Sequence, residues 1–409
     1  MAGPLEGITV LDLTWVLSGP YGAMVLCDLG AEVIKVERPP HGDLARTTGP
    51  HINGVSGYFM SINRGKKSIS IDLAKEEGKE LFLKLVEQAD VVVENFTPGA
   101  MDGLGLGYEA LRERNPRIIY AATSGFGQTG PDRLRPALDV VVQGMGGVMS
   151  ITGHPGGPPT RPGLSLGDIA GGLFTAIGVL AALQERERSG EGQLVDVSML
   201  DCQVAVLENA FMRYFATGDV PGPIGTRHPL ATPFQAFPTK DGYLVLALWG
   251  GAENQWEMLC ALLGTPELIY DERFATNEDR TENHSELEPL MFEAMKQRPT
   301  AEWLSEFDAI GIPCGPLNTI AEAAEHPQVR AREMLVEVDH PVAGKLRLAN
   351  TPIKLSRTPG GIKGPAPAIG QHTDEVLRDL LGTSDAEITK LRESGVLLET
   401  GAADVGQAG

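Results

Sequence analysis

The first 200 or so residues alternate short apolar, β-branched runs with segments of helical periodicity. Strands are expected over residues 7–13, 31–37, 67–73, 90–96, 117–124 and 193–199, with helices between them. Such an alternation makes the strands parallel and lays the helices on the faces of the sheet. The sequence therefore predicts an α/β protein with a Rossmann-like large domain and a mostly parallel sheet.

Helices are also expected over Asp139–Ser150 and Asp168–Arg188, and the second is apolar nearly all round, which is typical of a buried helix. Two Pro/Gly-rich stretches, 216–242 and about 340–370, have no periodicity. Structureless stretches of this length are unusual inside a compact domain. We expect two long linkers, a large domain of residues 1–215 and 330–409, and a linker with a smaller α/β domain over 216–329.

The charge of the chain excludes one class of function. The formal net charge is −20, whereas sequence-independent nucleic-acid binding depends on neutralising phosphates. The N-terminus has no basic, apolar leader, and the apolar segment Ile169–Leu183 is too short to span a bilayer comfortably. Four scattered cysteines favour reduced thiols: Cys27, Cys202, Cys260 and Cys314. We expect a cytoplasmic protein that binds neither nucleic acid nor membrane.

One motif suggests a dinucleotide site. Residues Gly125–Gly130 read G-x-G-x-x-G after an expected strand. The dinucleotide fingerprint requires a helix that opens in this loop and an acidic residue about 20 positions on. Here the chain continues with Pro131 and two arginines, and no apolar helix begins before about Ala137. A turn built for close backbone approach is the favoured interpretation. Eight scattered histidines give no paired metal spacing.

Asp168 stands at the start of the apolar helix. Its structural interpretation is a helix N-cap, and its functional one is a nucleophile. The two are compatible, because backbone donors and the helix dipole hold a carboxylate there in its charged form. Gly167, Gly171 and Gly172 are expected to leave room beside it for a bulky substrate.

Beyond these features, the chain resembles the class III CoA-transferases, the family of formyl-CoA transferase and carnitine CoA-transferase. The motifs that carry the resemblance are "GITVLDLTWVLSGPYGAMVLCDLGAEVIKVERPPHGD", "NRGKKSISIDL", "ADVVVENFTPGAMDGLGLGYEAL", "NPRIIYAATSGFGQTGP", "GQLVDVSMLD" and "GIPCGPLNT". The resemblance implies that Asp168 attacks an acyl-CoA thioester to give a mixed anhydride. CoA thiolate then returns to form an aspartyl-CoA thioester, which a second carboxylic acid attacks. It implies no metal and no resident cofactor, and succinyl-CoA is an expected donor.

The resemblance also assigns positions that contact CoA. They are Val16, Leu17, Ser18, Arg38, Ile71, Asp72, Leu73, Ala74, Asn95 and Phe96. Two cations of the family are missing, because the corresponding positions hold Gly103 and Pro136. The candidate replacements are Arg46, Arg64, Lys66 and Lys67, unless this basic run is only a solvated face. Asp139 matches an acidic residue near the nucleophile and is a possible second catalytic group or another N-cap.

An alternative activity is that of an α-methylacyl-CoA racemase-like isomerase, because the same fold carries that reaction. Racemisation needs two acid/base groups on opposite faces of the α-carbon. The racemase has a histidine where this chain has Leu138, and leucine cannot take a proton. A CoA-binding protein without activity is a further alternative. The resemblance finally implies an interlocked homodimer in which ring-shaped chains thread each other.

Overall fold

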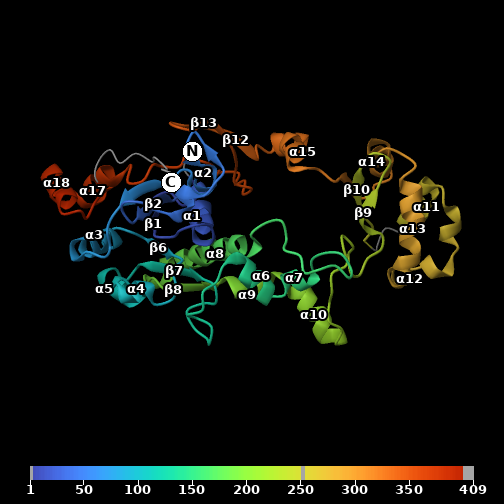
Figure 1. Cartoon of the computed structure of the whole chain (residues 1–409), viewed down its shortest axis with the longest axis horizontal. Coiled ribbons are helices and arrows are strands. Elements are labelled where there is room, and N and C mark those ends of the chain that lie inside the picture. The colour runs from blue at the N-terminus through green and yellow to red at the C-terminus, as the bar shows by residue number, and fades with distance from the viewer. Residues whose placement is uncertain (1–2, 250–253, 399–409) are drawn as a thin grey trace. The chain divides into compact units, whose positions relative to one another are not determined.

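The computed structural model describes residues 3–249 and 254–398 (Figure 1), and the tail expected over residues 399–409 lies outside this range. The chain divides into two compact units. Of the described residues, the larger comprises 3–148, 161–216 and 328–398, and the smaller comprises 149–160, 217–249 and 254–327. The short segment 149–160 belongs to the smaller unit, although the predicted boundaries placed it in the large domain.

The larger unit is built on a six-stranded sheet in the order β5-β2-β1-β6-β7-β8. The strands are β1 (Thr9–Asp12), β2 (Glu32–Glu37), β5 (Lys67–Ser70), β6 (Val91–Glu94), β7 (Ile119–Ser124) and β8 (Leu194–Ser198). Every pairing between neighbours is parallel. Numbered along the chain, the order is 3-2-1-4-5-6, the arrangement of a Rossmann sheet, so the predicted fold class is confirmed.

Helices cover both faces of this sheet, because alternate strand residues point to opposite sides. On one face, Val10, Val91 and Val93 pack with α1 (Ser18–Asp28) and α8 (Leu166–Ser189). On the other, Leu11 and Val92 pack with α3 (Glu76–Glu87), α5 (Tyr108–Arg114) and α17 (Thr373–Leu381). Figure 1 shows α3 and α5 on the side of the strands away from α8.

Several expected helices are shorter or longer than the sequence suggested. The helix expected over 139–150 is broken at Gly146–Gly147 into α6 (Asp139–Met145) and α7 (Val148–Ile151), because Gly147 has a positive φ of 93°. The helix expected over 200–217 is likewise two helices, α9 (Met199–Val206) and α10 (Glu208–Thr217).

Helix α8 has 24 residues, so it is longer than the apolar segment Ile169–Leu183, which by itself is too short to span a bilayer comfortably. Its length and composition would suit a membrane span, but half of its most apolar window is buried within the protein. Core helices of globular proteins have the same properties. The expectation that α8 is buried all round is wrong for one side, where Leu173, Phe174 and Ile177 are exposed.

The smaller unit has an antiparallel sheet in the order β11-β10-β9. Its strands are β9 (Phe234–Pro238), β10 (Tyr243–Ala247) and β11 (Cys314–Pro316), and its helices are α11 (Gln255–Leu263), α12 (Asn277–Glu282), α13 (His284–Met295) and α14 (Thr300–Ala309), with 3-10 turns η2 (Pro266–Ile269) and η3 (Glu272–Phe274). Their core is a separate apolar cluster around Trp303 and Phe307. Strand β9 falls inside the first expected linker.

The second expected linker also contains structure. Strand β12 (Leu335–His340) pairs with β13 (Gly344–Ala349) in a hairpin, and Ala343 and Leu346 pack on Phe59 of α2 (Gly57–Asn63). The remaining elements are β3 (His51–Ile52), β4 (Val55–Ser56), η1 (Leu44–Thr47), α4 (Ala100–Gly103), α15 (Ile320–Glu325), α16 (Pro327–Ala331) and α18 (Asp385–Glu393). The four cysteines are free, and three of them are buried.

Candidate active site

The carboxyl ends of the sheet strands meet at one edge of the larger unit. In a doubly wound sheet, ligands bind outside these ends at the point where the strand order reverses, which here lies between β1 and β6. Val16, Leu17 and Ser18 follow β1, whereas Asn95 and Phe96 follow β6 directly. The segments that the sequence singled out therefore flank the switch point.

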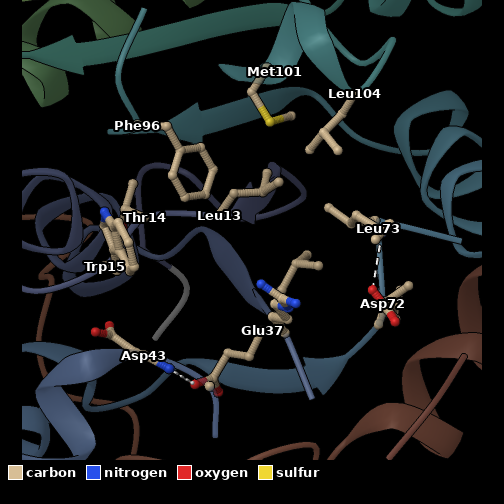
Figure 2. Close-up of a pocket in the computed structure, with 15 residues that line it drawn as sticks. Leu13, Thr14, Trp15, Glu37, Asp43, Asp72, Leu73, Phe96, Met101 and Leu104 are labelled. Carbon is tan, nitrogen blue, oxygen red and sulfur yellow. Dashed lines mark hydrogen bonds between the residues drawn. The ribbon is translucent and has the colours of Figure 1, made fainter. Parts of the chain in front are cut away.

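Two adjoining cavities lie at this edge and share Trp15 and Phe96 as lining residues. The first has a volume of about 330 Å³ and is lined by Leu13, Thr14, Trp15, Val36, Glu37, Arg38, Gly42, Asp43, Ile71, Asp72, Leu73, Ala74, Phe96, Met101 and Leu104. Figure 2 shows this cavity with the side chains of Leu13, Leu73, Phe96, Met101 and Leu104 around it. Its walls are mostly apolar.

The second cavity is smaller, about 170 Å³, and its lining includes Asp168. The other residues that line it are Trp15 to Ser18, Asn95 to Pro98, Thr123 to Gly125, Arg133, Arg135 to Leu138 and Met199. The rings of Trp15 and Phe96 are arranged edge to face with their centroids 5.7 Å apart, and both residues line the two cavities. All ten positions predicted to contact CoA line one or both cavities, together with Asp168. Asp139 does not line either cavity.

The turn after β1 is held in an unusual conformation. Val16 has a φ of 65°, which is strained for a β-branched residue. Its N–H donates to Asp43 Oδ1 at 2.9 Å, and Asp43 forms a buried ion pair with Lys35 at 2.9 Å. Lys35 also donates to the carbonyl of Thr14 at 2.6 Å. The buried ion pair of Lys35 and Asp43 thus fixes the turn that follows β1 and lines the second cavity.

The four cations proposed as phosphate contacts have carboxylate partners instead. Arg46 pairs with Glu37 at 2.7 Å, Arg64 with Asp28 at 2.6 Å and Lys66 with Asp12 at 2.8 Å, and all three cationic side chains are buried. Lys67 is shared between Glu32 and Glu375. For Arg46, Arg64 and Lys66, the prediction of phosphate contacts and the alternative of a solvated face are both wrong, because each is buried with its own counter-charge.

Three other cations line the cavities. Arg38 lines the first cavity, whereas Arg133 and Arg135 line the second. All three are exposed. Within the part of the chain that the structure describes, no carboxylate is within ion-pair distance of Arg38 or Arg133, and Arg135 has only a loose pair with Asp132 at 3.7 Å. These charges are available to an anionic ligand.

Asp168 occupies the third position of α8, while Ser165 is the N-cap and makes no side-chain capping bond. The expectation that Asp168 caps the helix is therefore wrong. Burial and, to a smaller extent, the charge of Asp139 raise the pKa of Asp168 to about 7, although Arg161 acts in the opposite direction. The expected lowering of this pKa by backbone donors is also wrong, because those donors bind another carboxylate.

That carboxylate belongs to Asp139, which is buried in the first turn of α6. Its Oδ1 accepts the N–H of Gly167 at 2.8 Å and, more weakly, that of Asp168 at 3.4 Å. Its Oδ2 accepts from Gln143 at 2.7 Å and from Arg161 at 2.9 Å. Asp139 therefore caps the N-terminus of α8, although it belongs to α6. The N-cap interpretation had expected Asp139 to cap its own helix.

The glycines near Asp168 do not leave open space. A Cβ atom on Gly172 would lie 2.5 Å from the carbonyl oxygen of Ser18, and one on Gly171 would lie 2.7 Å from Ser18 Oγ. A Cβ atom on Gly167 would lie 2.7 Å from Val142 Cγ2. These glycines allow α1 and α6 to approach α8 closely, so the expectation that they make room for substrate is wrong.

The G-x-G-x-x-G loop has the role of a close-approach turn, as predicted. A Cβ atom on Gly125 would lie 2.2 Å from Cβ of Ala137, and Gly127 and Gly130 both have positive φ. The loop thus brings the segment before α6 against the second cavity. Among residues 3–249 and 254–398, no three His, Cys, Asp or Glu side chains are placed to hold a metal. A reaction without metal or resident cofactor stays a prediction.

The sequence reasoning missed Trp15, Asp43 and Arg161. Trp15 could have been found, since it directly precedes three assigned residues and follows a strand. Asp43 and Arg161 gave no such signal, because their partners Val16 and Asp139 lie 27 and 22 residues away.

Comparisons with known proteins agree with this arrangement. Residues 5–373 match the family model described as CoA-transferase family III. The chain is 46% identical over 355 residues to acetyl-CoA:oxalate CoA-transferase of Acetobacter aceti, covering 87% of this chain and 90% of that protein. It is 39% identical over 395 residues to succinyl-CoA:glutarate CoA-transferase of Homo sapiens, covering 96% of this chain and 90% of that protein.

A solved structure is similar over nearly the same length. The crystal structure of a CAIB/BAIF family protein from Brucella suis matches with a TM-score of 0.83 and 40% identity, covering 93% of this chain and 100% of that one. Sequence and fold thus agree over both units of the chain. The chain belongs to CoA-transferase family III and is a CoA-transferase.

Proposed function

We propose that this enzyme moves CoA from an acyl-CoA thioester to a carboxylic acid, with Asp168 as the nucleophile. The observation that carries the proposal is that Asp168 lines the smaller of two adjoining cavities, and that the other is larger and mostly apolar. CoA has two corresponding parts, a bulky adenosine at one end and a thin pantetheine arm that ends in the reactive thioester. Adenosine would occupy the larger cavity, and the thioester would reach Asp168.

The reaction begins when a carboxylate oxygen of Asp168 attacks the thioester carbonyl carbon. A C–O bond forms, the C–S bond breaks, and CoA leaves as a thiolate beside a mixed anhydride. The thiolate then attacks the aspartyl carbonyl, which releases the first acid and leaves an aspartyl-CoA thioester. The acceptor acid attacks that thioester, and CoA thiolate then takes the acyl group from the second anhydride. Asp168 is regenerated and one thioester replaces another.

The pKa of Asp168, raised to about 7 by burial and Asp139, suits this role. The more basic a carboxylate is, the better it attacks, and near neutral pH a large fraction of Asp168 is already ionised. The aspartyl anhydride is attacked in the same partly water-excluded cavity. Asp139 is a positioning residue in this account, because its oxygens are occupied by the start of α8 and by Gln143 and Arg161.

CoA is a polyanion, whereas the chain is strongly acidic, so local cations are needed. Arg38 would contact the nucleotide end in the first cavity. Arg133 and Arg135, next to the position where Pro136 replaces a family lysine, would contact the diphosphate at the entrance of the second. Glu37 and Asp43 in the first cavity are neutralised by Arg46 and Lys35, which limits their repulsion of phosphate.

For the acceptor we propose a small dicarboxylic acid. Relatives at 39–46% identity are named for oxalate, glutarate, mesaconate and citramalate. The test is a panel of these acids with acetyl-CoA and succinyl-CoA as donors, in which the new thioester is followed by mass spectrometry. Formation of a new acyl-CoA that requires both donor and acid supports transfer. Binding of CoA without any new thioester would contradict it.

The racemase alternative is tested in the same assay. Leu138 lines the second cavity and cannot accept a proton, which supports transfer over isomerisation. A chiral 2-methylacyl-CoA in deuterated water should keep its α-hydrogen. Enzyme-dependent deuterium uptake at that carbon would favour the racemase.

We also propose a cytoplasmic, interlocked homodimer. Apolar side chains on α8 and α10 are exposed in the single chain, among them Phe174, Ile177, Met212 and Phe215, and a second copy would bury them. Sedimentation should give a dimer that does not dissociate on dilution while it stays folded. A folded monomer at low concentration would contradict the interlocking.

A further inference from the structure

Ser18 has a buried hydroxyl group without a hydrogen-bond partner in the described part of the chain. Buried hydroxyls in native proteins almost always have a partner, so an unpaired one requires an explanation. Ser18 is only 5% exposed, yet it lines the second cavity together with Asp168. The hydroxyl oxygen itself is covered, so a ligand in that cavity reaches it once the Ser18 side chain turns about its Cα–Cβ bond.

The position of Ser18 relative to Asp168 follows from α8. Ser18 Oγ lies 2.7 Å from where a Cβ atom of Gly171 would be. Gly171 comes three residues after Asp168 on the same helix, so the two positions share a face and are about 5–6 Å apart. The Ser18 hydroxyl thus lies within about 8 Å of the base of the Asp168 side chain.

The backbone around Ser18 adds further donors. Ser18 is the first residue of α1, an 11-residue helix whose N-cap, Leu17, makes no side-chain capping bond. The N–H groups of Ser18 and Gly19 lie in the first turn, where no carbonyl of the helix can accept them. The N-terminal end of a helix also favours negative charge. A hydroxyl and the start of a helix therefore meet beside Asp168.

We propose that Ser18 is a catalytic residue that donates a hydrogen bond to the oxyanion of the acyl-transfer intermediates. When Asp168 attacks the thioester, the carbonyl π electrons move onto oxygen, and that oxygen accepts from Ser18 Oγ. The bond is released when the carbonyl re-forms and the C–S bond breaks, so no proton is transferred. This inference rests on the proposed CoA transfer through Asp168 and adds the group that stabilises its transition states.

The test is Ser18→Ala in the full-length enzyme, with Thr175→Val as the matched control. Thr175 has a buried hydroxyl that already bonds Thr123 and the carbonyl of Gly171, at 2.6 and 2.8 Å. Ser18→Ala should lower kcat by about 100-fold, the usual effect of removing one oxyanion donor. The KM for acyl-CoA should change by less than about threefold, because the bond forms in the transition state. Its midpoint of urea unfolding should not fall, because the lost hydroxyl had no partner.

Thr175→Val should behave in the opposite way, with lower stability and a kcat within about threefold of wild type, since its hydroxyl bonds are structural. Wild-type kcat in Ser18→Ala would overturn the inference, as would a loss of kcat explained by a matching loss of folded protein. Wild-type enzyme that forms no new thioester would instead refute the proposed function itself. The two failures are therefore distinguishable.

Discussion

Oδ1 of Asp139 accepts the backbone N–H of Gly167 at 2.8 Å, so one helix is capped by a carboxylate from another. Because this carboxylate is charged and close to Asp168, it contributes to raising the pKa of the proposed nucleophile. Arg161 binds the same carboxylate at 2.9 Å and acts on that pKa in the opposite direction. Asp139 thus holds the start of α8 in place and also raises the pKa of Asp168.

The first prediction concerns the opposite effects of Asp139 and Arg161 on the pKa of Asp168. The wild-type kcat/KM for acyl-CoA should rise with pH through a midpoint near 7, because only ionised Asp168 attacks. Asp139→Asn keeps an oxygen that can accept from Gly167 but removes the negative charge, so the midpoint should move down by about half a unit or more. Arg161→Gln removes the opposing positive charge and should move it up. Shifts of both variants in one direction would contradict the account.

The second prediction concerns Arg133 and Arg135, the two arginines that line the second cavity. Arg133→Gln with Arg135→Gln should raise the KM for acyl-CoA about tenfold, since two charged contacts to the diphosphate are lost at an exposed site. The KM for the acceptor acid and for an acyl-pantetheine, which has no phosphate, should be unchanged. Arg117→Gln, an exposed arginine before the amino end of β7, is the matched charge control. A raised KM for the acid alone would mean that these arginines bind a carboxylate instead.

The family resemblance assigned the residues of this site, and the ends of the strands explain why those residues lie together. Once residues 7–13, 31–37 and 90–96 are recognised as parallel strands, the residues that follow them must gather at one edge. That is why Val16, Arg38 and Asn95 line adjoining cavities although they are far apart in sequence. Strand ends are local features, so a single sequence reveals them.

Contacts across the fold could not be predicted in the same way. Lys66 looked like a surface cation because its neighbours in sequence are basic, but its partner Asp12 comes 54 residues earlier. Gly171 was expected to leave space for substrate, because the sequence does not show that Ser18 of α1 fills the space beside it. The hairpin of β12 and β13, by contrast, was missed although Val336–Asp339 and Lys345–Leu348 alternate apolar and polar residues.

The third prediction tests the buried ion pair of Lys66 and Asp12. Burial pushes the pKa of Asp12 up, but Lys66 and Lys35 bring it below its ordinary value, so the carboxylate is charged at neutral pH. Lys66→Met should lower the free energy of unfolding by about 3–5 kcal/mol, because it leaves that charge buried and poorly compensated. Lys67→Met, at the next and partly exposed residue, should cost less than about 1 kcal/mol. Equal losses in urea unfolding would contradict this assignment.

The pair also predicts the effect of acid. The folded-state pKa of Asp12 is lower than that of the unfolded chain, so its contribution to stability is present above the unfolded value and is lost as pH falls through the folded one. Wild type should therefore lose more stability than Lys66→Met below about pH 4.

The fourth prediction concerns the stability cost of the nucleophile. The folded-state pKa of Asp168, about 7, is above the unfolded value, so wild type should lose stability as pH rises from about 4 to 7. Asp168→Asn has no charge to bury and should be more stable than wild type at pH 8, by on the order of 1 kcal/mol. The difference should vanish near pH 4. A less stable Asn variant at pH 8 would mean that the Asp168 charge has a favourable partner.

The central claim is that Asp168 forms the covalent bond to the acyl group. The most direct measurement is to incubate the enzyme with acyl-CoA and hydroxylamine, without acceptor acid, and to map the modified residue by peptide mass spectrometry. The account predicts a hydroxamate on Asp168 in wild type and none in Asp168→Ala, whose transfer should fall by several orders of magnitude while the protein stays folded. A hydroxamate on Asp139 or another residue, or near-normal transfer by Asp168→Ala, would contradict the account.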